Sequence, residues 1–66
     1  MSDFIKRLEI EIAELEVKIS KLESFLTTPT FGELAKVDQI LLQSQLEIME
    51  EYSRILNARY ARLTRG

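Results

Sequence analysis

The chain has 66 residues, of which 45% are hydrophobic and 30% charged, and its formal net charge is −2. A chain this short buries only a modest part of its surface, so a lone two-helix unit would be marginally stable and association is the remaining way to gain buried area. Because it contains neither cysteine nor histidine, the sequence excludes a disulfide framework, a thiolate or imidazole metal site and a histidine general base.

The first predicted helix covers residues 3–26, with no proline or glycine inside it. Its apolar residues alternate spacings of three and four, the a/d pattern of a helix that packs lengthwise on a partner. These residues are Ile5, Leu8, Ile12, Leu15, Ile19, Leu22 and Leu26. Ile10 and Val17 lie off this stripe.

Residues 27–37 are predicted to form a corner, because Pro29 disfavours a helical conformation in the residue before it and lacks a backbone donor. Thr30, followed by a glutamate three residues later, has the pattern of a capping box, and Thr28 before the proline is a second possible helix start. We expect a short helical turn near residues 30–35. The apolar side chains expected to close this end of the hairpin are Phe31 and Leu34.

The second long helix is predicted over residues 38–64, with Asp38 opening it. One apolar column repeats every seven residues and a second column flanks it. The first column is Leu42, Met49, Leu56 and Leu63; the second is Leu41, Ile48 and Ile55. The corner lets this helix return antiparallel to the first. The sequence thus predicts one all-α domain over residues 1–66, an antiparallel helical hairpin.

Each predicted helix has more apolar surface than one partner helix needs. We therefore expect hairpins to associate as a homo-oligomer, a dimer or tetramer with a helical-bundle core. The alternative is that Ile10 and Val17 are scattered surface residues, which are common on folded proteins. No apolar run approaches the roughly 18 residues of a membrane span, and the N-terminus does not resemble a signal peptide, so we expect a cytosolic protein.

A polar line accompanies the apolar columns of the second helix. Gln45, Tyr52 and Arg59 are spaced by seven, which keeps side chains on nearly one line along a helix. In one interpretation Gln45 and Arg59 meet glutamates of the first helix and fix its register, with the Tyr52 hydroxyl at the edge of the core. In the other, the line walls a pocket between hairpins, where Tyr52 stacks on a ring and Arg59 pairs with an anion. Spacing alone favours the first interpretation.

The charge is divided unevenly along the chain. Residues 1–51 carry eleven acidic and five basic side chains, whereas residues 52–66 carry four arginines and no acid. A net-acidic chain is a poor candidate for sequence-independent binding along DNA, so we expect no nucleic-acid polymer as a partner. Its cationic end can still hold a small anion.

The antiparallel return concentrates positive charge at the open end of the hairpin. It places the arginines at the end of the chain near Lys6 and Arg7, beside the positive end of the first helix dipole. The expected contributors to an anion site there are Lys6, Arg7, Arg59, Arg62 and Arg65, with Phe4 and Tyr60 as aromatic surface. The alternative is a solvated charged face.

No catalytic constellation appears in the sequence. The carboxylates of the first helix have no histidine, cysteine or metal motif beside them. Gly32 and Gly66 are isolated, so the sequence contains no glycine-rich phosphate loop. We expect a binding protein without a cofactor or a metal, and no enzyme.

The chain resembles small phage and prophage proteins related to a crAss-like phage gene product. The similar segments are "FIKRLEIEIAELEVKISKLESFL" and "DQILLQSQLEIMEEYSRILNARY", and the resemblance covers about nine-tenths of the chain. The matching residues are Phe25, Phe31, Leu34, Gln39, Leu41, Leu42, Gln45, Met49, Tyr52, Leu56 and Arg59. The chain departs from the pattern at Ala35, Lys36 and Val37, which leaves the start of the second helix open.

This resemblance implies a phage-encoded helical hairpin, dispensable for growth and directed against host defence inside an infected bacterial cell. Small helical phage proteins of this kind include oligomeric sponges that sequester cyclic-nucleotide signals of CBASS-type immunity. Extended to this chain, the expectation is a protein that binds a cyclic oligonucleotide, with Arg59 on phosphate, Tyr52 stacked on a base and Gln45 at a base edge. The alternatives are a protein that occludes a host protein through its apolar surface and a structural coiled-coil part of a phage particle.

Overall fold

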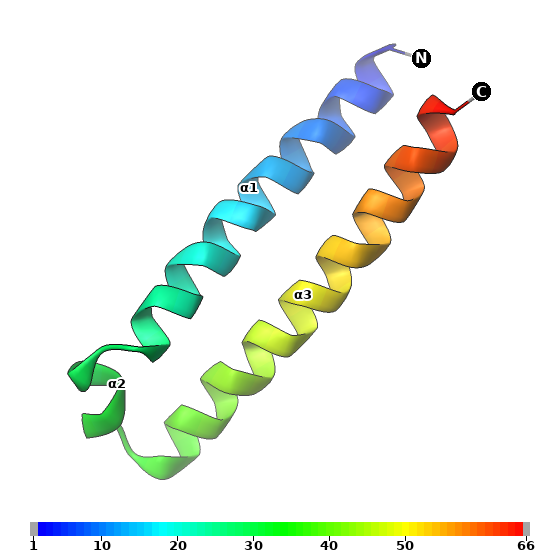
Figure 1. Cartoon of the computed structure of the whole chain (residues 1–66). Helices are drawn as coiled ribbons and strands as arrows, with labels where there is room; N and C mark the ends of the chain where they lie inside the picture. Colours follow the sequence, from blue (N-terminus) through cyan, green and yellow to red (C-terminus); the bar gives the residue numbers. More distant parts are fainter. Residues whose placement is uncertain (1, 66) are drawn as a thin grey trace.

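Two long helices lie side by side and antiparallel, joined by a short helical corner (Figure 1). The structure is a computed structural model and describes residues 2–65, which contain helices and turns but no strand. The helices are α1 (Ser2–Leu26), α2 (Pro29–Glu33) and α3 (Lys36–Thr64). The Cα atoms fill a rod of 48 × 14 × 13 Å, with the start of α1 and the end of α3 at one pole. The all-α hairpin predicted from the sequence is confirmed.

The core is a single seam between α1 and α3. Leu8 and Leu15 of α1 and Leu56 of α3 are its buried residues. All seven residues of the predicted α1 stripe are buried or half-buried, as the alternation of three and four requires of a helix with one partner. Partly buried residues that pack against the buried three are Ile12, Ile19, Met49 and Tyr60. Three buried leucines make a thin core for a chain of this length.

The second buried column of α3 was not predicted from the sequence. Beside Leu42, Met49 and Leu56, the positions turned towards α1 are Gln39, Leu46, Ser53 and Tyr60, all half-buried. The apolar column on the other side, Leu41, Ile48 and Ile55, is exposed. Both columns adjoin the Leu42 column on the helix surface, and the rotation of α3 decides which one is covered.

The corner begins differently from the expected capping box. Thr28, not Thr30, caps α2: its hydroxyl accepts a hydrogen bond from the Phe31 backbone N–H at 3.3 Å, and Pro29 occupies the first helical position. Proline suits this position because its fixed φ is helical and the donor it lacks would be unpaired. Phe31 then meets Phe25 edge-to-face, with ring centroids 6.1 Å apart, and closes this end of the hairpin.

The start of α3 also differs from the prediction. The helix begins at Lys36, two residues before Asp38, and its N-cap Ala35 has no capping side chain. The Ala35 carbonyl accepts hydrogen bonds from the backbone N–H groups of Asp38 and Gln39, at 2.9 and 3.1 Å. The Gln39 amide donates to the Leu34 carbonyl at 2.9 Å and so ties the corner to the helix. Asp38 lies in the first turn, where a carboxylate favours the positive end of the dipole.

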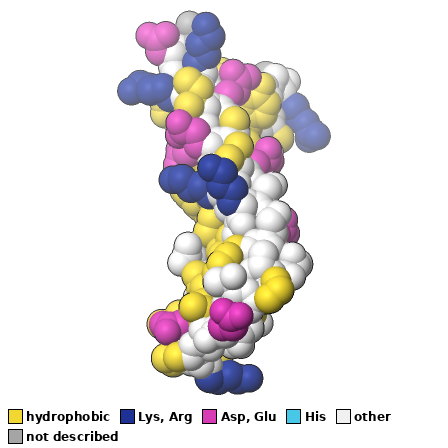
Figure 2. Space-filling view, turned by 90° about the vertical axis from the view of Figure 1, so that its left-hand side faces the viewer, with side chains coloured by type: hydrophobic (Ala, Val, Ile, Leu, Met, Phe, Trp, Pro, Cys, Tyr) yellow, Lys and Arg dark blue, Asp and Glu magenta, His cyan; other side chains and the backbone are white. Residues whose placement is uncertain are grey.

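The outward side of α1 mixes charged and apolar residues. Ile10 and Val17 are exposed there. Figure 2 shows this side of the molecule, with Lys or Arg and Asp or Glu side chains intermingled over the upper part and hydrophobic side chains between them. Within residues 2–65, none of the helices is both long and apolar enough to cross a membrane.

Candidate ligand-binding site

Two tyrosines of α3 reach across the hairpin to glutamates of α1. The Tyr60 hydroxyl donates to the Glu9 carboxylate at 2.7 Å, and the Tyr52 hydroxyl donates to the Glu11 carboxylate. Because Glu9 and Glu11 are two residues apart, they lie about 200° apart around α1. The tyrosines therefore mark opposite long sides of the hairpin, called here the Tyr52 flank and the Tyr60 flank.

The predicted polar line runs along the Tyr52 flank. Gln45, Tyr52 and Arg59 are all exposed, so the line lies beside the seam and not within it. The hydrogen bond to Glu11 is the main cause of a raised pKa for Tyr52, and Arg59 nearby acts in the opposite direction. Tyr52 therefore remains a protonated donor, and the residue is exposed.

The two polar neighbours of Tyr52 do not meet glutamates of α1. The Gln45 amide contacts the Met49 sulfur of its own helix at 3.8 Å. In the described residues the one salt bridge is Arg54 to Glu51, so Arg59 has no carboxylate partner there. The interpretation in which Gln45 and Arg59 fix register through glutamates is wrong, because their column faces solvent at the edge of the seam. Of the three residues in this line, only Tyr52 hydrogen-bonds to α1.

A shallow hollow lies on the Tyr52 flank at the open end of the hairpin. Its lining residues are Phe4 of α1 and Arg59, Arg62 and Leu63 of α3, and its volume is about 210 Å³. Two unpaired guanidinium groups thus stand beside an aromatic ring and a leucine side chain. Arginine forks suit phosphate and aromatic faces suit bases, so this combination fits a nucleotide.

The Tyr60 flank has a different character. A second hollow, of about 140 Å³, is lined by Glu9, Ile12, Asn57 and Tyr60. The hydrogen bond to Glu9 is the main cause of a raised pKa for Tyr60, whose ring also packs against the core. A carboxylate and no cation line this hollow, so it does not suit an anion. Tyr60 is held here as part of the fold.

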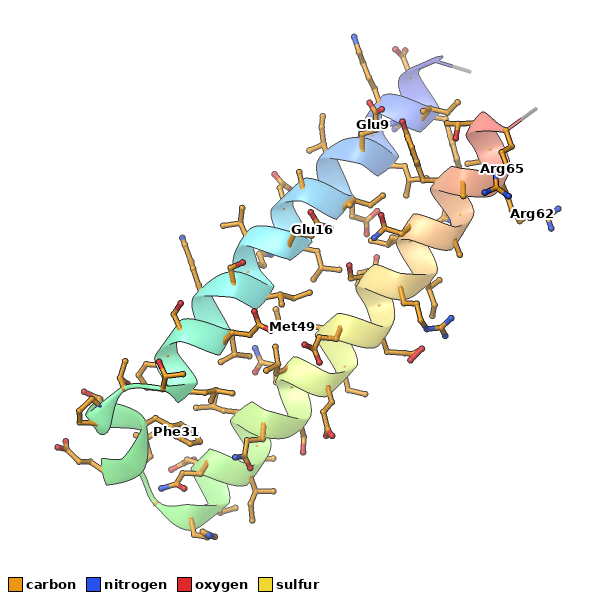
Figure 3. All side chains as sticks on the ribbon, viewed as in Figure 1. Glu9, Glu16, Phe31, Met49, Arg62 and Arg65 are labelled. Carbon is orange, nitrogen blue, oxygen red and sulfur yellow. The ribbon has the colours of Figure 1, made fainter. Side chains whose placement is uncertain are left out.

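Lys6 and Arg7 occupy a third place. With Asp3 and Ile10 they line an open depression of about 470 Å³ that belongs to α1 alone. The seven candidate residues therefore divide into three groups. Gln45, Tyr52, Arg59 and Arg62 share the Tyr52 flank, Tyr60 lies on the opposite flank, and Lys6 and Arg7 lie on the outside of α1. Figure 3 labels Arg62 in the last turn of α3 and Arg65 directly after the helix, at the same pole as Glu9.

The hollow beside Arg59 and Arg62, called here the arginine hollow, has two wall residues that were not predicted as ligand contacts. Phe4 was expected only as aromatic surface, and Leu63 only as part of an apolar column. Both follow from the antiparallel return, which sets the first turn of α1 against the last turns of α3. Among residues 2–65, no group of three or more carboxylates could hold a metal ion.

A comparison with known protein families matches residues 2–62 to the Sequestin family. The chain belongs to that family. No significant match was found among curated proteins or among solved structures.

The Sequestin match spans nearly the whole hairpin, including every residue of the arginine hollow except Leu63. The family name is consistent with a protein that sequesters a target, and so with binding without chemistry. It does not name the target, which has to be inferred from the chemistry of the hairpin surface.

Proposed function

We propose that this Sequestin family member is a phage-encoded immune-evasion protein that binds and sequesters a cyclic oligonucleotide second messenger. The observation that carries the proposal is the pair of unpartnered arginines, Arg59 and Arg62, beside Phe4 on the same flank as Tyr52. A cyclic dinucleotide presents two phosphates for guanidinium groups and two bases for aromatic faces. Sequestration needs no chemical step, only a free concentration lowered by tight binding.

The residues have separate roles in this proposal. Arg59 and Arg62 pair with phosphate oxygens, and Tyr52 offers a ring face to a base. Tyr52 and Arg59 are seven residues apart, about 10 Å along the helix, a span that one dinucleotide covers. Gln45 hydrogen-bonds a base edge. Tyr60 supports the site through the fold, and Lys6 and Arg7 raise the positive potential at the same pole.

The direct test is isothermal titration calorimetry with cyclic di- and trinucleotides, and with ADP-ribose and AMP as pyrophosphate and single-phosphate comparisons. We expect heat and saturation with at least one cyclic oligonucleotide and none with AMP. Arg59→Gln should weaken binding at least tenfold, as loss of a charge-assisted hydrogen bond predicts. Binding of ADP-ribose alone would move the ligand class to pyrophosphate nucleotides. No heat with any member at micromolar protein would refute the proposal.

The matched control is Arg54→Gln. It removes the same charge from the same helix, but Arg54 is exposed and paired with Glu51 within α3. If both variants lose affinity equally, the binding reflects net charge and not a site. The ultraviolet spectrum of freshly purified protein adds a rapid check, because two tyrosines and no tryptophan absorb weakly compared with a carried-over nucleotide.

The exposed apolar column Leu41, Ile48 and Ile55 favours a second candidate, a protein that occludes a host protein surface. An amphipathic helix that presents such a column is a common recognition element. A nucleotide-free spectrum, silent calorimetry and recovery of one defined host protein with the wild-type chain but not with Ile48→Glu would favour this function.

A further inference from the structure

Glu11 brings a negative charge to the Tyr52 flank. Phe4, Glu11 and Lys18 are spaced by seven, so they lie on one line along α1, and all three are exposed. This line faces the Tyr52 flank, because Phe4 lines the arginine hollow and Glu11 accepts the hydrogen bond of Tyr52. A carboxylate therefore stands beside a site proposed to bind an anion. In that place it repels phosphate, unless a donor of the ligand meets it.

The position of Glu11 along the flank lies between the contacts proposed for the base and for the phosphates. Tyr52 and Arg59 are about 10 Å apart along α3. The Cα–Cβ bonds of a helix tilt towards its N-terminus, which for α1 is the pole of the arginine hollow and for α3 is the corner (Figure 1). Glu11 therefore approaches Tyr52 from the side on which the arginines lie.

The ribose is the part of a nucleotide that joins its base to its phosphate. With a base on Tyr52 and phosphates at Arg59 and Arg62, as proposed above, the ribose comes to lie beside Glu11. In a 3′,5′-linked cyclic dinucleotide the bridging phosphates are ionised and donate no hydrogen bond, whereas each ribose keeps a free 2′-hydroxyl. A carboxylate that accepts a hydrogen bond from a ribose hydroxyl is a recurrent feature of nucleotide sites.

Glu11 has acceptor capacity left for such a donor. An ionised carboxylate presents about four lone-pair positions. In the part of the chain that the structure describes, Glu11 accepts one side-chain hydrogen bond, from Tyr52 to its Oε2 atom, and forms no salt bridge. Oε1 is thus left to the ligand, while the bond to Oε2 restrains the carboxylate.

Glu9 makes the same type of contact in surroundings that do not suit a nucleotide. It accepts a hydrogen bond from Tyr60 at 2.7 Å, but the residues that line the hollow beside it include no arginine or lysine. A phosphate has no partner there, so no ribose is brought to Glu9. The two glutamates therefore form a matched pair for experiment, on the same helix but on different flanks.

We infer that Glu11 is a specificity-determining residue, which accepts a hydrogen bond from a ribose 2′-hydroxyl and selects ribonucleotides over 2′-deoxyribonucleotides. The inference rests on the proposed function, because the base on Tyr52 and the phosphates on the arginines place the ribose. The effect of Glu11 is larger on selectivity than on affinity, since its carboxylate also repels the phosphates. A site built to hydrogen-bond a hydroxyl rejects the analogue that lacks it.

The test is isothermal titration calorimetry with 3′,3′-cyclic GMP–AMP and with its analogue carrying 2′-fluoro groups in place of both 2′-hydroxyls. Fluorine is close to a hydroxyl in size but donates no hydrogen bond. We expect the wild-type chain to bind the ribose form about tenfold tighter, and Glu11→Ala to reduce this preference below about threefold, as loss of a hydrogen bond to a charged group predicts. Equal affinities of the wild-type chain for the two ligands would overturn the inference and leave the proposed function standing.

Glu9→Ala is the matched control, because it removes the same charge and the same type of tyrosine contact from α1. It should leave the preference at about tenfold. If Glu11→Ala instead tightens the binding of both ligands by the same factor, Glu11 acts only by repelling phosphate, and the inference is wrong. Silent titrations of the wild-type chain with both ligands would count against the proposed function and overturn the inference with it.

Tyr52→Phe separates direct contact with the sugar from support of the tyrosine ring. Phenylalanine keeps a ring for stacking but donates nothing to Glu11. If Glu11 meets the sugar itself, the Tyr52→Phe chain should still prefer the ribose form, and adding Glu11→Ala should remove that preference. If Glu11 only orients Tyr52, both single variants lose the preference and the double variant loses no more. That outcome would contradict a contact between Glu11 and the ribose.

Discussion

The two flanks of the hairpin share the same type of contact between helices, but the surroundings of that contact differ. On each, a tyrosine of α3 donates a hydrogen bond to a glutamate of α1. On the Tyr60 flank the ring packs against the core and the neighbouring hollow is lined by a carboxylate and an amide. On the Tyr52 flank the tyrosine residue is 43% exposed, and the hollow at the end of that flank is lined by two arginines, a phenylalanine and a leucine.

The difference between the two flanks extends along the length of the hairpin. The Tyr60 flank carries polar and acidic positions of both helices, which are Glu9, Glu16, Glu23, Gln43, Glu50 and Asn57. Figure 3 labels two of them, Glu9 and Glu16, which are seven residues or about two turns apart on α1. The Tyr52 flank instead carries the exposed Ile48 and Ile55 and the unpaired Arg59 and Arg62 of α3. A tyrosine–glutamate hydrogen bond therefore does not by itself mark a ligand site. The side chains around it distinguish the two flanks.

The largest expected effect comes from a substitution in the buried seam between α1 and α3, on which both flanks depend. Leu56 is fully buried, so Leu56→Ala should lower the free energy of unfolding by about 2–5 kcal/mol, through lost burial and an unfilled cavity. A loss of that size is a large part of the total free energy of unfolding of a small domain. Thermal unfolding followed by circular dichroism measures the loss. Leu63→Ala, in the same column but 43% exposed, should lose less than half as much.

The next effect should separate the flanks. Tyr60→Ala should lower the unfolding temperature more than Tyr52→Ala, because only Tyr60 packs against the buried leucines. Ligand affinity should show the reverse order, with Tyr52→Ala losing stacking on a base. The two measurements are an unfolding curve for each variant and a calorimetric titration of each. The same order in both measurements would contradict the division between a structural flank and a binding flank.

Much of this arrangement could be predicted from the sequence. The features that could not be predicted have a physical cause. The stripe of α1 predicts the seam because a helix with one partner buries only positions three and four apart. The sequence does not decide which column beside Leu42 is covered. Leu46 and Tyr60 on one side offer as much apolar area as Ile48 and Ile55 on the other. That choice depends on the rotation of α3, which is set by contacts with α1 along the whole helix.

The candidate site was less predictable than the fold for the same reason. Spacing by seven places Gln45, Tyr52 and Arg59 on one line but leaves open which way the line faces. The rotation that exposes the line also removes Arg59 from the glutamates of α1. Phe4 enters the hollow from the other end of the sequence, so no local pattern around Arg59 could have indicated it.

The titration of the tyrosines is expected to change stability only in alkali. Both tyrosines have a pKa raised above the ordinary 10.0, chiefly by their hydrogen bonds to Glu11 and Glu9. A group whose pKa is raised on folding stabilises the fold below its unfolded pKa, and this contribution is lost as the pH rises through the folded value. The free energy of unfolding should therefore fall above pH 10.

Absorbance of the ionised phenol separates the two contributions. In a Tyr60→Phe chain only Tyr52 titrates, and Glu11→Gln should then return its pKa towards 10.0 by removing the charged acceptor. In a Tyr52→Phe chain, Glu9→Gln should do the same for Tyr60. An unshifted midpoint on one flank would show that the glutamate there does not raise the pKa of its tyrosine.

The smallest expected effect compares one residue type on the two flanks. Gln43 and Gln45 are both exposed and two residues apart on α3, so they face opposite sides of the hairpin. Gln45→Ala removes only a contact with the Met49 sulfur, and neither substitution should change the unfolding temperature measurably. Alanine suits a helix interior at least as well as glutamine, which removes propensity as a cause of loss.

Base preference is where these two glutamines should differ. A side chain that hydrogen-bonds a base edge contributes more to discrimination between bases than to overall affinity. Gln45→Ala should therefore narrow the difference in affinity between adenine- and guanine-containing cyclic dinucleotides, while Gln43→Ala leaves it unchanged. Competition titrations of paired ligands measure this difference more accurately than separate affinities do. Equal behaviour of the two variants would place the base edge away from Gln45 and leave the arginines and Tyr52 as the ligand contacts of that flank.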